Sequence, residues 1–485
     1  MKVMPLTEDM FINGKVVSAE DKMKLYNPAQ LDEVVGEITM GTKEHVDQAV
    51  EAAYEAWGDW SQYAPEKRAS YLKSTANYIE QNLESLTELL VLENGKLLSE
   101  ARSELLAAAN VLKYYSGLAN ELDKEEVIEN EQGKMILTRQ PMGVVSIIVP
   151  WNYPVLLGFM MASPALLAGN TVVLKPSTYS PLTLTRILHH MAGELPKGAL
   201  NVVLGSGSKV GSAMTAHEKV RKITFTGSTE IGSEIIAEAA KTIKNFSMEL
   251  GGNDAAIILS DKNIDDDLIN RMIKGVFTYS GQICYAIKRI YVSKDNYDEF
   301  VSKFTAAADR LRVGPGLNSE STLGPINNKA QLDVIQQLLE KVEKTNAKVT
   351  TVGQFVEGVS ADQGNYILPR VITNVTNDDD IVKKEQFGPI IPIVPFETEE
   401  EAIAFANDTE FGLGNSVWTS DEEKGFELAR KLQSGSVFVN IHQVGASAVN
   451  MPFGGFKQSG IGRGHGVEGL YEHTELQALI RRTDM

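Results

Sequence analysis

From Gly143 onward the chain alternates short apolar strands with helical segments, and this rhythm limits the possible folds more than any other feature. The apolar runs 144–149, 171–174, 201–204 and 222–225 each lead into a turn that contains glycine or proline. Short apolar strands that alternate with helices predict a parallel sheet with helices on both faces. We therefore expect an α/β fold of the doubly wound, Rossmann type.

The remaining segments predict a second α/β unit, a helical N-terminal third and an exposed hairpin. A second alternation of strands and helices begins near Ala255 and runs to about Ile441. Apolar residues at three- and four-residue spacing predict helices over 44–57 and 66–83, and two more between 86 and 118. Residues 123–139 are acidic at first and then β-prone, which predicts an exposed strand or hairpin.

Composition excludes several classes of protein. With 46 basic and 64 acidic residues, the net charge of −18 disfavours binding to nucleic acid or to an anionic membrane. The most apolar stretch, 144–169, is cut by three prolines, so we expect a strand, a turn and a core helix, with no membrane span. A single cysteine and no evident signal peptide predict a reducing, cytoplasmic location. We expect no metal site.

That single cysteine, Cys284, is a candidate nucleophile. A free cysteine is more often a small buried apolar residue, so its own setting does not decide the matter. Glu249, at the end of an apolar run, is costly to bury unless it is paired or faces a cleft, and a surface ion pair is the alternative. Asn152, between two prolines, can donate to an oxyanion or simply stabilise its own turn. Together they form a nucleophile, a base and an amide donor for carbonyl chemistry.

The glycine-rich turns predict an anion site at the carboxyl edge of the sheet. The run 205–211 has three glycines but not the usual dinucleotide spacing, so alone it is also consistent with an ordinary tight turn. Three successive turns that each present a helix N-terminus are a stronger signal. Ser228 can cap its helix and donate to a phosphate, or act only as an N-cap.

Seven segments together resemble the NAD(P)-dependent aldehyde dehydrogenase superfamily, in order and in spacing. The resemblance covers the chain from Phe11 to Gly460. The segments are Pro150-Trp151-Asn152-Tyr153-Pro154, Leu174-Lys175-Pro176-Ser177, Phe225-Thr226-Gly227-Ser228-Thr229, Glu249-Leu250-Gly251-Gly252-Asn253-Asp254, Gly281-Gln282-Ile283-Cys284, Glu385-Gln386-Phe387-Gly388-Pro389 and Pro452-Phe453-Gly454-Gly455.

The resemblance implies a role for each matching residue. Cys284 corresponds to the nucleophile, Glu249 to the general base and Asn152 to the oxyanion donor. Lys175 corresponds to the lysine that contacts the adenosine ribose, and Ser228 to the residue that contacts the pyrophosphate. Glu385 and Phe387 correspond to the residues that hold the nicotinamide ribose. Further residues expected at the cofactor site are Trp151, Ser177, Thr178, Gly207 and Gly211.

Thr178 bears on the choice between NAD and NADP. Relatives that prefer NAD often carry Glu three residues after the lysine, where it holds the ribose hydroxyls and repels a 2′-phosphate. Because this chain has Thr178 there, we expect either cofactor to be accepted, with NADP favoured.

Four residues should line the substrate tunnel: Tyr153, Met160, Thr278 and Ile283. Relatives that act on succinate semialdehyde carry arginine at the positions of Met160 and Thr278. Relatives that act on glyceraldehyde 3-phosphate carry arginine at the position of Ile283. We therefore expect a neutral, apolar or aromatic aldehyde. A betaine aldehyde, held by aromatic rings, or a semialdehyde is the alternative.

The resemblance also implies a division into domains. Residues 1–121 and 141–248 should form the dinucleotide-binding domain, 249–446 the catalytic domain, and 122–140 with 465–485 an oligomerisation arm of a homodimer or homotetramer.

Two other classes of enzyme are alternatives to a dehydrogenase that forms the carboxylic acid. A CoA-acylating enzyme would not need Glu249. A cysteine hydrolase needs an activating histidine, for which His442 is the candidate.

Overall fold

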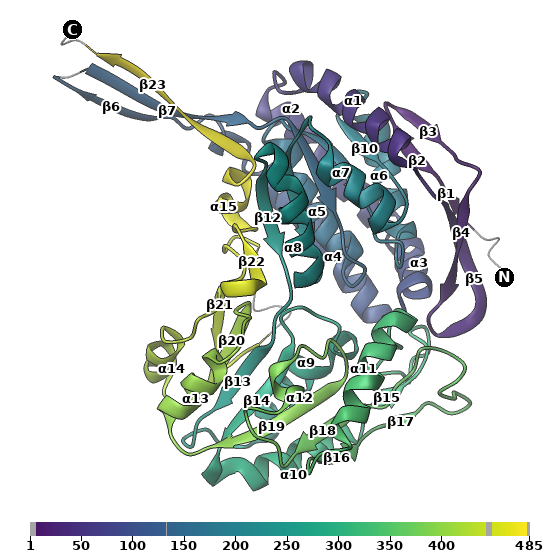
Figure 1. Cartoon of the computed structure of the whole chain (residues 1–485), viewed down its shortest axis with the longest axis vertical. Coiled ribbons are helices and arrows are strands. Elements are labelled where there is room, and N and C mark those ends of the chain that lie inside the picture. Colours follow the sequence, from purple (N-terminus) through teal and green to yellow (C-terminus); the bar gives the residue numbers. More distant parts are fainter. Residues whose placement is uncertain (1–5, 132, 443–448, 483–485) are drawn as a thin grey trace.

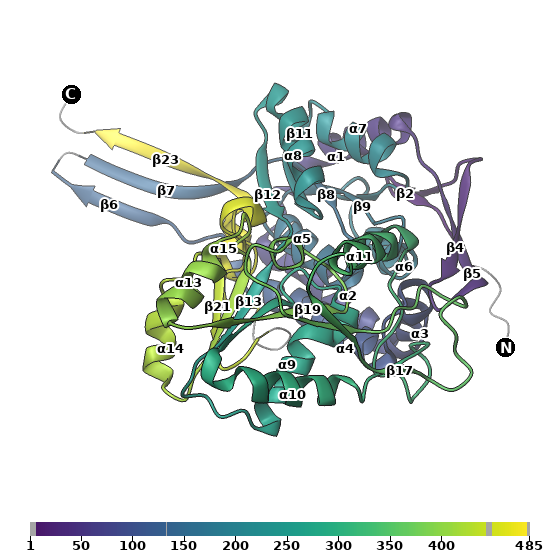
Figure 2. The same ribbon diagram turned by 60° about the horizontal axis from the view of Figure 1, so that its bottom comes forward.

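The computed structural model of the chain describes residues 6–131, 133–442 and 449–482. Two large sheets with their helices occupy the two halves of the molecule, and a narrow arm extends from the upper half (Figure 1). The same arrangement is seen when the molecule is turned by 60° (Figure 2), where the arm still stands clear of both halves.

The upper sheet has a parallel centre and antiparallel edges. Its strands in spatial order are β22 (Gly460–Ile461), β12 (Asn245–Glu249), β11 (Val220–Thr226), β8 (Val144–Ile148), β9 (Thr171–Lys175), β10 (Leu200–Val202), β2 (Met10–Ile12) and β3 (Lys15–Val17). β8 to β12 run parallel, whereas β22, β2 and β3 are antiparallel to their neighbours. The doubly wound sheet expected from the sequence is therefore confirmed.

The order of the strands creates a switch point between β8 and β11. From β8 the chain proceeds outward through β9 to β10, and then returns to place β11 and β12 on the other side of β8. Because crossovers are right-handed, this reversal moves the connecting helices to the opposite face of the sheet. A crevice forms at the carboxyl ends of strands where the order reverses, and ligands of such sheets bind there.

Helices cover this sheet in two layers on one side. α5 (Pro154–Leu167) and α6 (Leu182–Glu194) pack on each other and on β8 to β10, and α2 and α4 pack outside them. The others are α1 (Lys43–Trp60), α2 (Pro65–Gln81), α3 (Leu83–Asn94), α4 (Leu98–Ser116), α7 (Ser212–Ala216) and α8 (Thr229–Ala239). Gly95, with φ of 89°, ends α3 between the two helices expected over 86–118.

The lower sheet is parallel except at one edge. Its order is β16 (Lys348–Thr351), β18 (Arg370–Thr373), β19 (Ile390–Phe396), β14 (Ile287–Ser293), β13 (Asp254–Ile258), β20 (Gly414–Trp418) and β21 (Ser436–Val439), with β16 antiparallel. Its helices are α9 (Asp266–Phe277), α10 (Tyr297–Ala308), α11 (Lys329–Val342), α12 (Asp380–Lys383), α13 (Glu399–Asn407) and α14 (Glu422–Ala429). β15 (Arg312–Val313) pairs with β17 (Gln354–Phe355) beside it.

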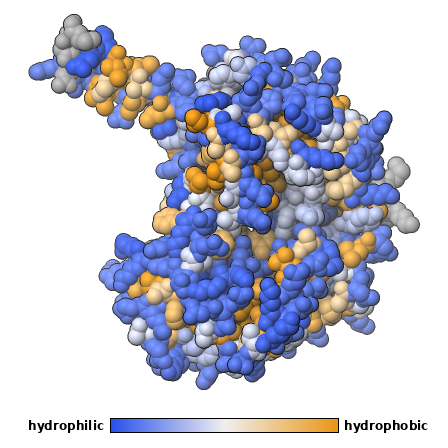
Figure 3. Space-filling model, in the orientation of Figure 1, coloured by the Kyte–Doolittle hydropathy of each residue, from blue (hydrophilic) through white to orange (hydrophobic). Residues whose placement is uncertain are grey.

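Three strands form the arm. The predicted hairpin is β6 (Glu126–Asn130) with β7 (Gly133–Pro141), and β23 (Thr474–Arg482) pairs with the other edge of β7. The short helix α15 (Gly466–Tyr471) leads into β23. Large apolar side chains are exposed along the arm (Figure 3), among them Val127, Leu476, Leu479 and Ile480.

A small N-terminal sheet, β1 (Leu6–Glu8), β5 (Gln30–Thr39) and β4 (Lys22–Asn27), lies at the side of the upper half. The domain boundaries drawn from the sequence stay predictions. Of the residues they include, 1–5, 132, 443–446 and 483–485 lie outside the described residues.

Candidate active site

Cys284 follows a strained turn between α9 and β14. The three residues Tyr279, Ser280 and Gly281 have φ of 51°, 52° and 74°, and two of them are not glycine. Left-handed backbone at a bulky residue is costly and persists only where the surroundings hold it in place. Here the Tyr279 N–H donates to Glu100 Oε1 at 2.7 Å, and its hydroxyl donates to Asn94 Oδ1 at 2.6 Å.

Asn152 lies in the loop after β8 and is 5% exposed. Its side-chain Nδ2 donates to the carbonyl of Gln282 at 3.1 Å, so the structure brings it to the Cys284 loop. The Asn152 carbonyl accepts from Lys96 Nζ at 2.9 Å. Lys96 and Glu104 form an ion pair with both side chains 0% exposed, which anchors this loop from below.

The same Glu104 caps α5. Its Oε1 accepts from the backbone N–H groups of Val155 and Leu156 at 2.8 and 3.2 Å, at the first turn of that helix. The Lys96 ammonium lies 4.2 Å from the ring centroid of Tyr153 and 4.4 Å from that of Tyr279. Lys96 and Glu104 therefore join the loop of Asn152 to the strained turn before Cys284.

Glu249 is the last residue of β12, at the carboxyl edge of the upper sheet. Its Oε2 atom is buried and has no hydrogen-bond partner among the described residues. Burial raises the pKa of this carboxyl to about 8, although Arg463 lowers it and Glu472 adds to the rise. A carboxyl with a pKa this close to neutrality is suited to act as a general base.

The thiol of Cys284 is held in its neutral form. Burial raises its pKa to about 12, Lys288 opposes that rise, and the charges of Glu249, Asp254 and Glu385 add to it. The surrounding carboxylates disfavour a free thiolate, so a reaction of the sulfur as a nucleophile needs a base that takes the proton of the thiol.

Gly251 and Gly252 allow other segments of the chain to come close to their backbone. A Cβ on Gly251 would lie 2.6 Å from Glu385 Oε2, and one on Gly252 would lie 2.7 Å from the Cys284 carbonyl oxygen. The groups that lie against these two glycines are the Glu385 carboxylate and the Cys284 backbone.

The residues predicted to hold the cofactor lie at the carboxyl ends of β9, β10 and β11. Lys175 ends β9, is 4% exposed, and donates to the carbonyls of Pro176 and Gly205 at 3.0 and 3.1 Å. Burial lowers its pKa to about 8. Ser177 and Thr178 follow it and are half-buried.

The turn after β10 leaves open backbone beside it. A Cβ on Gly207 would meet nothing within 4 Å, whereas one on Gly211 would lie 3.9 Å from Lys175 Cε. The exposed Ser228 caps α8 by accepting from the Ile231 N–H at 3.4 Å. These residues fit a dinucleotide, since they combine a buried lysine, uncovered glycine backbone and a helix N-terminus.

Trp151 and Phe387 come together from opposite halves of the chain. Their rings meet edge to face with centroids 5.5 Å apart. Glu385, two residues before Phe387, accepts from the Gly252 N–H at 3.2 Å and lies 3.5 Å from Lys288 Nζ. The structure thus brings three predicted cofactor residues to the loop of Cys284.

The predicted tunnel residues differ in their surroundings. Ile283 is 1% exposed and packs with Tyr279 and Ala286, against which Trp151, Tyr153 and Tyr285 also pack. Met160, on α5, is half-buried against the upper core. Thr278 follows α9 and turns its hydroxyl to the Lys274 carbonyl at 2.8 Å, so that hydroxyl is engaged by its own helix.

His442 is unsuited to activate the thiol. Its Nδ1 hydrogen-bonds to Ser416 Oγ at 2.8 Å and its Nε2 to the Tyr285 carbonyl at 3.0 Å. Burial lowers its pKa to about 3. Both ring nitrogens are therefore occupied, which removes the histidine that a cysteine hydrolase would need.

Five charged residues near the site were not singled out from the sequence: Lys96, Glu104, Asp254, Lys288 and Arg463. Of these only Asp254 lies in a quoted motif, and their surroundings depend on partners from other segments of the chain. Glu104 illustrates this, because its partners are Lys96 and the first turn of α5. The one available signal is that Lys288 and Asp254 interrupt otherwise apolar strand segments.

Comparison with known proteins identifies the class to which this fold and site belong. The family model of aldehyde dehydrogenases matches residues 16–479. Betaine aldehyde dehydrogenase of Bacillus subtilis is 35% identical over 489 aligned residues, covering 99% of this chain and 98% of that protein. Glutarate-semialdehyde dehydrogenase of Pseudomonas putida is 35% identical over 478, covering 97% of each.

Solved structures agree. The crystal structure of betaine aldehyde dehydrogenase from Staphylococcus aureus in complex with NAD+ matches with a TM-score of 0.94 and 33% identity, covering 99% of this chain and 96% of that one. The chain therefore belongs to the aldehyde dehydrogenase family. It is an NAD(P)-dependent oxidoreductase, and the family and fold expected from the sequence are confirmed.

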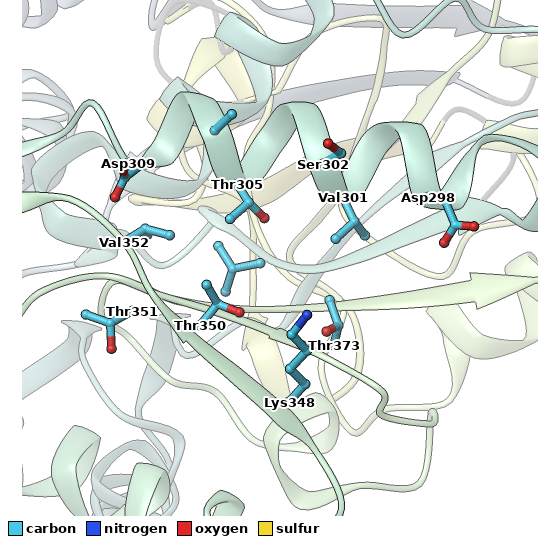
Figure 4. A pocket seen from close by; sticks show the side chains of 12 residues that line it. Asp298, Val301, Ser302, Thr305, Asp309, Lys348, Thr350, Thr351, Val352 and Thr373 are labelled. Atoms are coloured by element: carbon cyan, nitrogen blue, oxygen red, sulfur yellow. The ribbon is translucent and has the colours of Figure 1, made fainter.

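One surface hollow lies away from these residues. An open depression of about 540 Å³ lies between α10 and the strands β16 and β18, where Asp298, Thr305, Lys348 and Thr373 line it (Figure 4). None of the predicted site residues lines this depression. Among the described residues, no helix combines the length and the apolar character needed to cross a lipid bilayer.

Proposed function

We propose that this enzyme oxidises a neutral, apolar or aromatic aldehyde to its carboxylic acid through covalent intermediates on Cys284. The observation that carries the proposal is the convergence of three groups: the Asn152 amide bonded to the Cys284 loop, the thiol, and the buried Glu249 whose charge acts on that thiol. These are the nucleophile, oxyanion donor and base that acyl chemistry requires.

The residues then act in sequence. Glu249, in its ionised form, draws the proton from the thiol, and the sulfur attacks the aldehyde carbon to form a hemithioacetal. The Asn152 amide and the Cys284 N–H stabilise the negative oxygen that results. When bound, the nicotinamide supplies the acceptor for the hydride that leaves this carbon, and a thioester remains on Cys284. Glu249 releases the proton that it took from the thiol to the solvent, and in its ionised form it then takes a proton from the water that hydrolyses the thioester.

NAD or NADP would be held by residues from both halves of the molecule. We assign the adenosine ribose to Lys175 with Ser177 and Thr178, the adenosine side to Gly207 and Gly211, and the pyrophosphate to Ser228. Glu385 and Phe387, with Trp151 against the Phe387 ring, would take the nicotinamide ribose. Because Thr178 carries no negative charge, we propose that NADP is accepted and preferred.

The substrate proposal rests on the side chains around the thiol. Aromatic and aliphatic groups flank Cys284, among them Trp151, Tyr153, Tyr285 and Ile283. No arginine stands at Met160, Thr278 or Ile283 to pair with a carboxylate or phosphate. The same rings give the second candidate, a quaternary-ammonium aldehyde, since aromatic faces attract cations.

We propose that the three-stranded arm joins copies of the chain into a homodimer or homotetramer. Its exposed apolar side chains are suited to pack against another subunit. Sedimentation of the wild type and of Leu479→Glu tests this, with a smaller species expected for the variant. The cytoplasmic location stays a prediction from the lone cysteine.

A panel of aldehydes tests the function. Purified enzyme with NAD or NADP should reduce the cofactor with an aromatic or long aliphatic aldehyde, and less with succinate semialdehyde or betaine aldehyde. Cys284→Ala should abolish this activity. Reduction that depends on added CoA would instead support a CoA-acylating enzyme, and substrate turnover without nicotinamide would support a hydrolase.

A further inference from the structure

A buried lysine lies against the backbone of the predicted nucleophile. Lys288 is the second residue of β14, and its side chain is 3% exposed. Its ammonium donates to the carbonyl of Ile283 at 2.9 Å and also to the carbonyl of Cys284. Burial of a lysine cation away from water costs free energy unless polar groups replace the lost water. Lys288 therefore does more here than fill space.

The same ammonium contacts the predicted cofactor loop. It lies 3.5 Å from Glu385 Oε1, and 5.9 Å from the ring centroid of Phe387. Glu385 is in turn fixed by the Gly252 N–H at 3.2 Å. Lys288 therefore connects the backbone of the nucleophile to the carboxylate expected to hold the nicotinamide ribose.

The charges around the thiol come from four different segments. Three carboxylates act against ionisation of Cys284: Glu249 at the end of β12, Asp254 at the start of β13 and Glu385 after α12. Lys288, on β14, is the cation that acts in its favour. The nearby His442 is neutral, because burial lowers its pKa to about 3.

We propose that Lys288 is a positioning residue of the reaction. It fixes the carbonyls of Ile283 and Cys284, and it supplies the positive charge that offsets the surrounding carboxylates while the sulfur is a thiolate. This inference rests on the proposed role of Cys284 as the nucleophile. It adds a residue that the motifs of the chain did not mark.

The thiol itself provides the readout, because Cys284 is the one cysteine of the chain. The rate of its alkylation by iodoacetamide follows the fraction of thiolate, which changes tenfold for each unit of pKa. In Lys288→Met we expect this rate at pH 8 to fall about tenfold or more. Lys288→Arg keeps the charge, and should keep most of the rate.

Lys244 provides the matched control. It is also a buried lysine that donates to two backbone carbonyls, those of His217 and Val220 at 2.8 and 3.0 Å, but it lies outside the proposed site. Lys244→Met should alkylate at the wild-type rate, within about twofold. A tenfold loss in this control as well would show a general effect of removing a buried lysine, and would overturn the inference.

A second variant covers the case in which Lys288→Met does not fold. Lys288→Gln keeps amide donors for the two carbonyls and removes only the charge, so we expect the same loss of alkylation. Wild-type rates in the folded uncharged variants would overturn the inference. So would faster alkylation in both Lys288→Met and Lys288→Arg, because this would reveal only a loosened loop.

The outcome is independent of the test of function. If the wild type oxidises no aldehyde, the proposed function fails, while loss of alkylation in the Lys288 variants still supports the role of the lysine. If aldehyde oxidation is found and alkylation is unaffected by Lys288→Met and Lys288→Gln, the proposed function stands and the inference about Lys288 fails.

Discussion

The side-chain amide of Asn152 donates to the main-chain carbonyl of Gln282 at 3.1 Å. This bond joins the end of β8 in the upper sheet to the loop of Cys284, which belongs to the lower half. A primary amide has two N–H donors, so one is fixed against the loop and the other remains to bind a substrate oxygen. The proposed oxyanion donor is thus oriented by the loop that carries the proposed nucleophile.

Removal of that amide should reduce catalysis strongly. In Asn152→Ala we expect kcat/KM for the aldehyde to fall about 100- to 1000-fold, because loss of one oxyanion donor costs about 3 kcal/mol. Affinity for the cofactor, measured by fluorescence titration, should stay near that of the wild type. A decrease in kcat/KM of less than tenfold would contradict the assigned role.

Glu249 should control the second half of the reaction and its dependence on pH. Burial raises the pKa of its carboxyl from 4.5 to about 8, so most of it is protonated at pH 6 and the basic form appears as the pH rises through 8. Thioester hydrolysis, followed after a single turnover, should therefore rise over this range. In Glu249→Gln the rise should disappear and hydrolysis should slow about 100-fold or more.

The neighbouring charges provide a control for that pH dependence. Glu472 raises the pKa of Glu249, so Glu472→Gln should move the midpoint of hydrolysis to lower pH. Arg463 lowers it, so Arg463→Leu should move the midpoint to higher pH. If both variants kept the pH profile of the wild type, another group would be the base.

A negative charge at position 178 should change the choice of cofactor. In Thr178→Glu we expect kcat/KM with NADP to fall at least about tenfold, because the carboxylate repels a 2′-phosphate. The value with NAD should change little. Thr178→Gln, which has a similar size and no charge, should resemble the wild type, and a strong NAD preference in the wild type would refute the proposal for NADP.

The buried pair of Lys96 and Glu104 should be important for stability. Lys96→Met leaves the Glu104 carboxylate buried without its cation, and such changes cost about 3–5 kcal/mol in free energy of unfolding. The midpoint of urea denaturation should fall accordingly. Lys113→Met, which breaks the exposed pair with Glu80, should cost less than about 1 kcal/mol, and an equal effect in both variants would contradict this account.

The elements with strong local signals were predictable. The run 144–149 became β8, Val144–Ile148, and the predicted helix 66–83 became α2, Pro65–Gln81, with Pro65 at its first position. The periodicity of strands and helices and the residues of turns are local features, so a single sequence is enough to recognise them. The residues expected around Cys284 followed from the family resemblance, and the structure places Asn152 and Glu249 beside it.

Interactions between distant charges were not predictable in this way. Lys288, Lys96 and Glu104 look like surface residues in the sequence, since lysine and glutamate are rarely buried. They are buried because partners from other segments compensate them, and no local pattern encodes such a partner. The contact of Gly252 with Glu385 is of the same kind, because Glu385 approaches from 133 positions further on.

The pairing of β7 with β23 also sets an order of events during synthesis. β7 ends at Pro141, but its second partner is formed by residues 474–482, close to the end of the chain. Until those residues leave the ribosome, one side of β7 has no strand to bond with. The three-stranded arm can therefore be completed only after residues 142–473 have been translated.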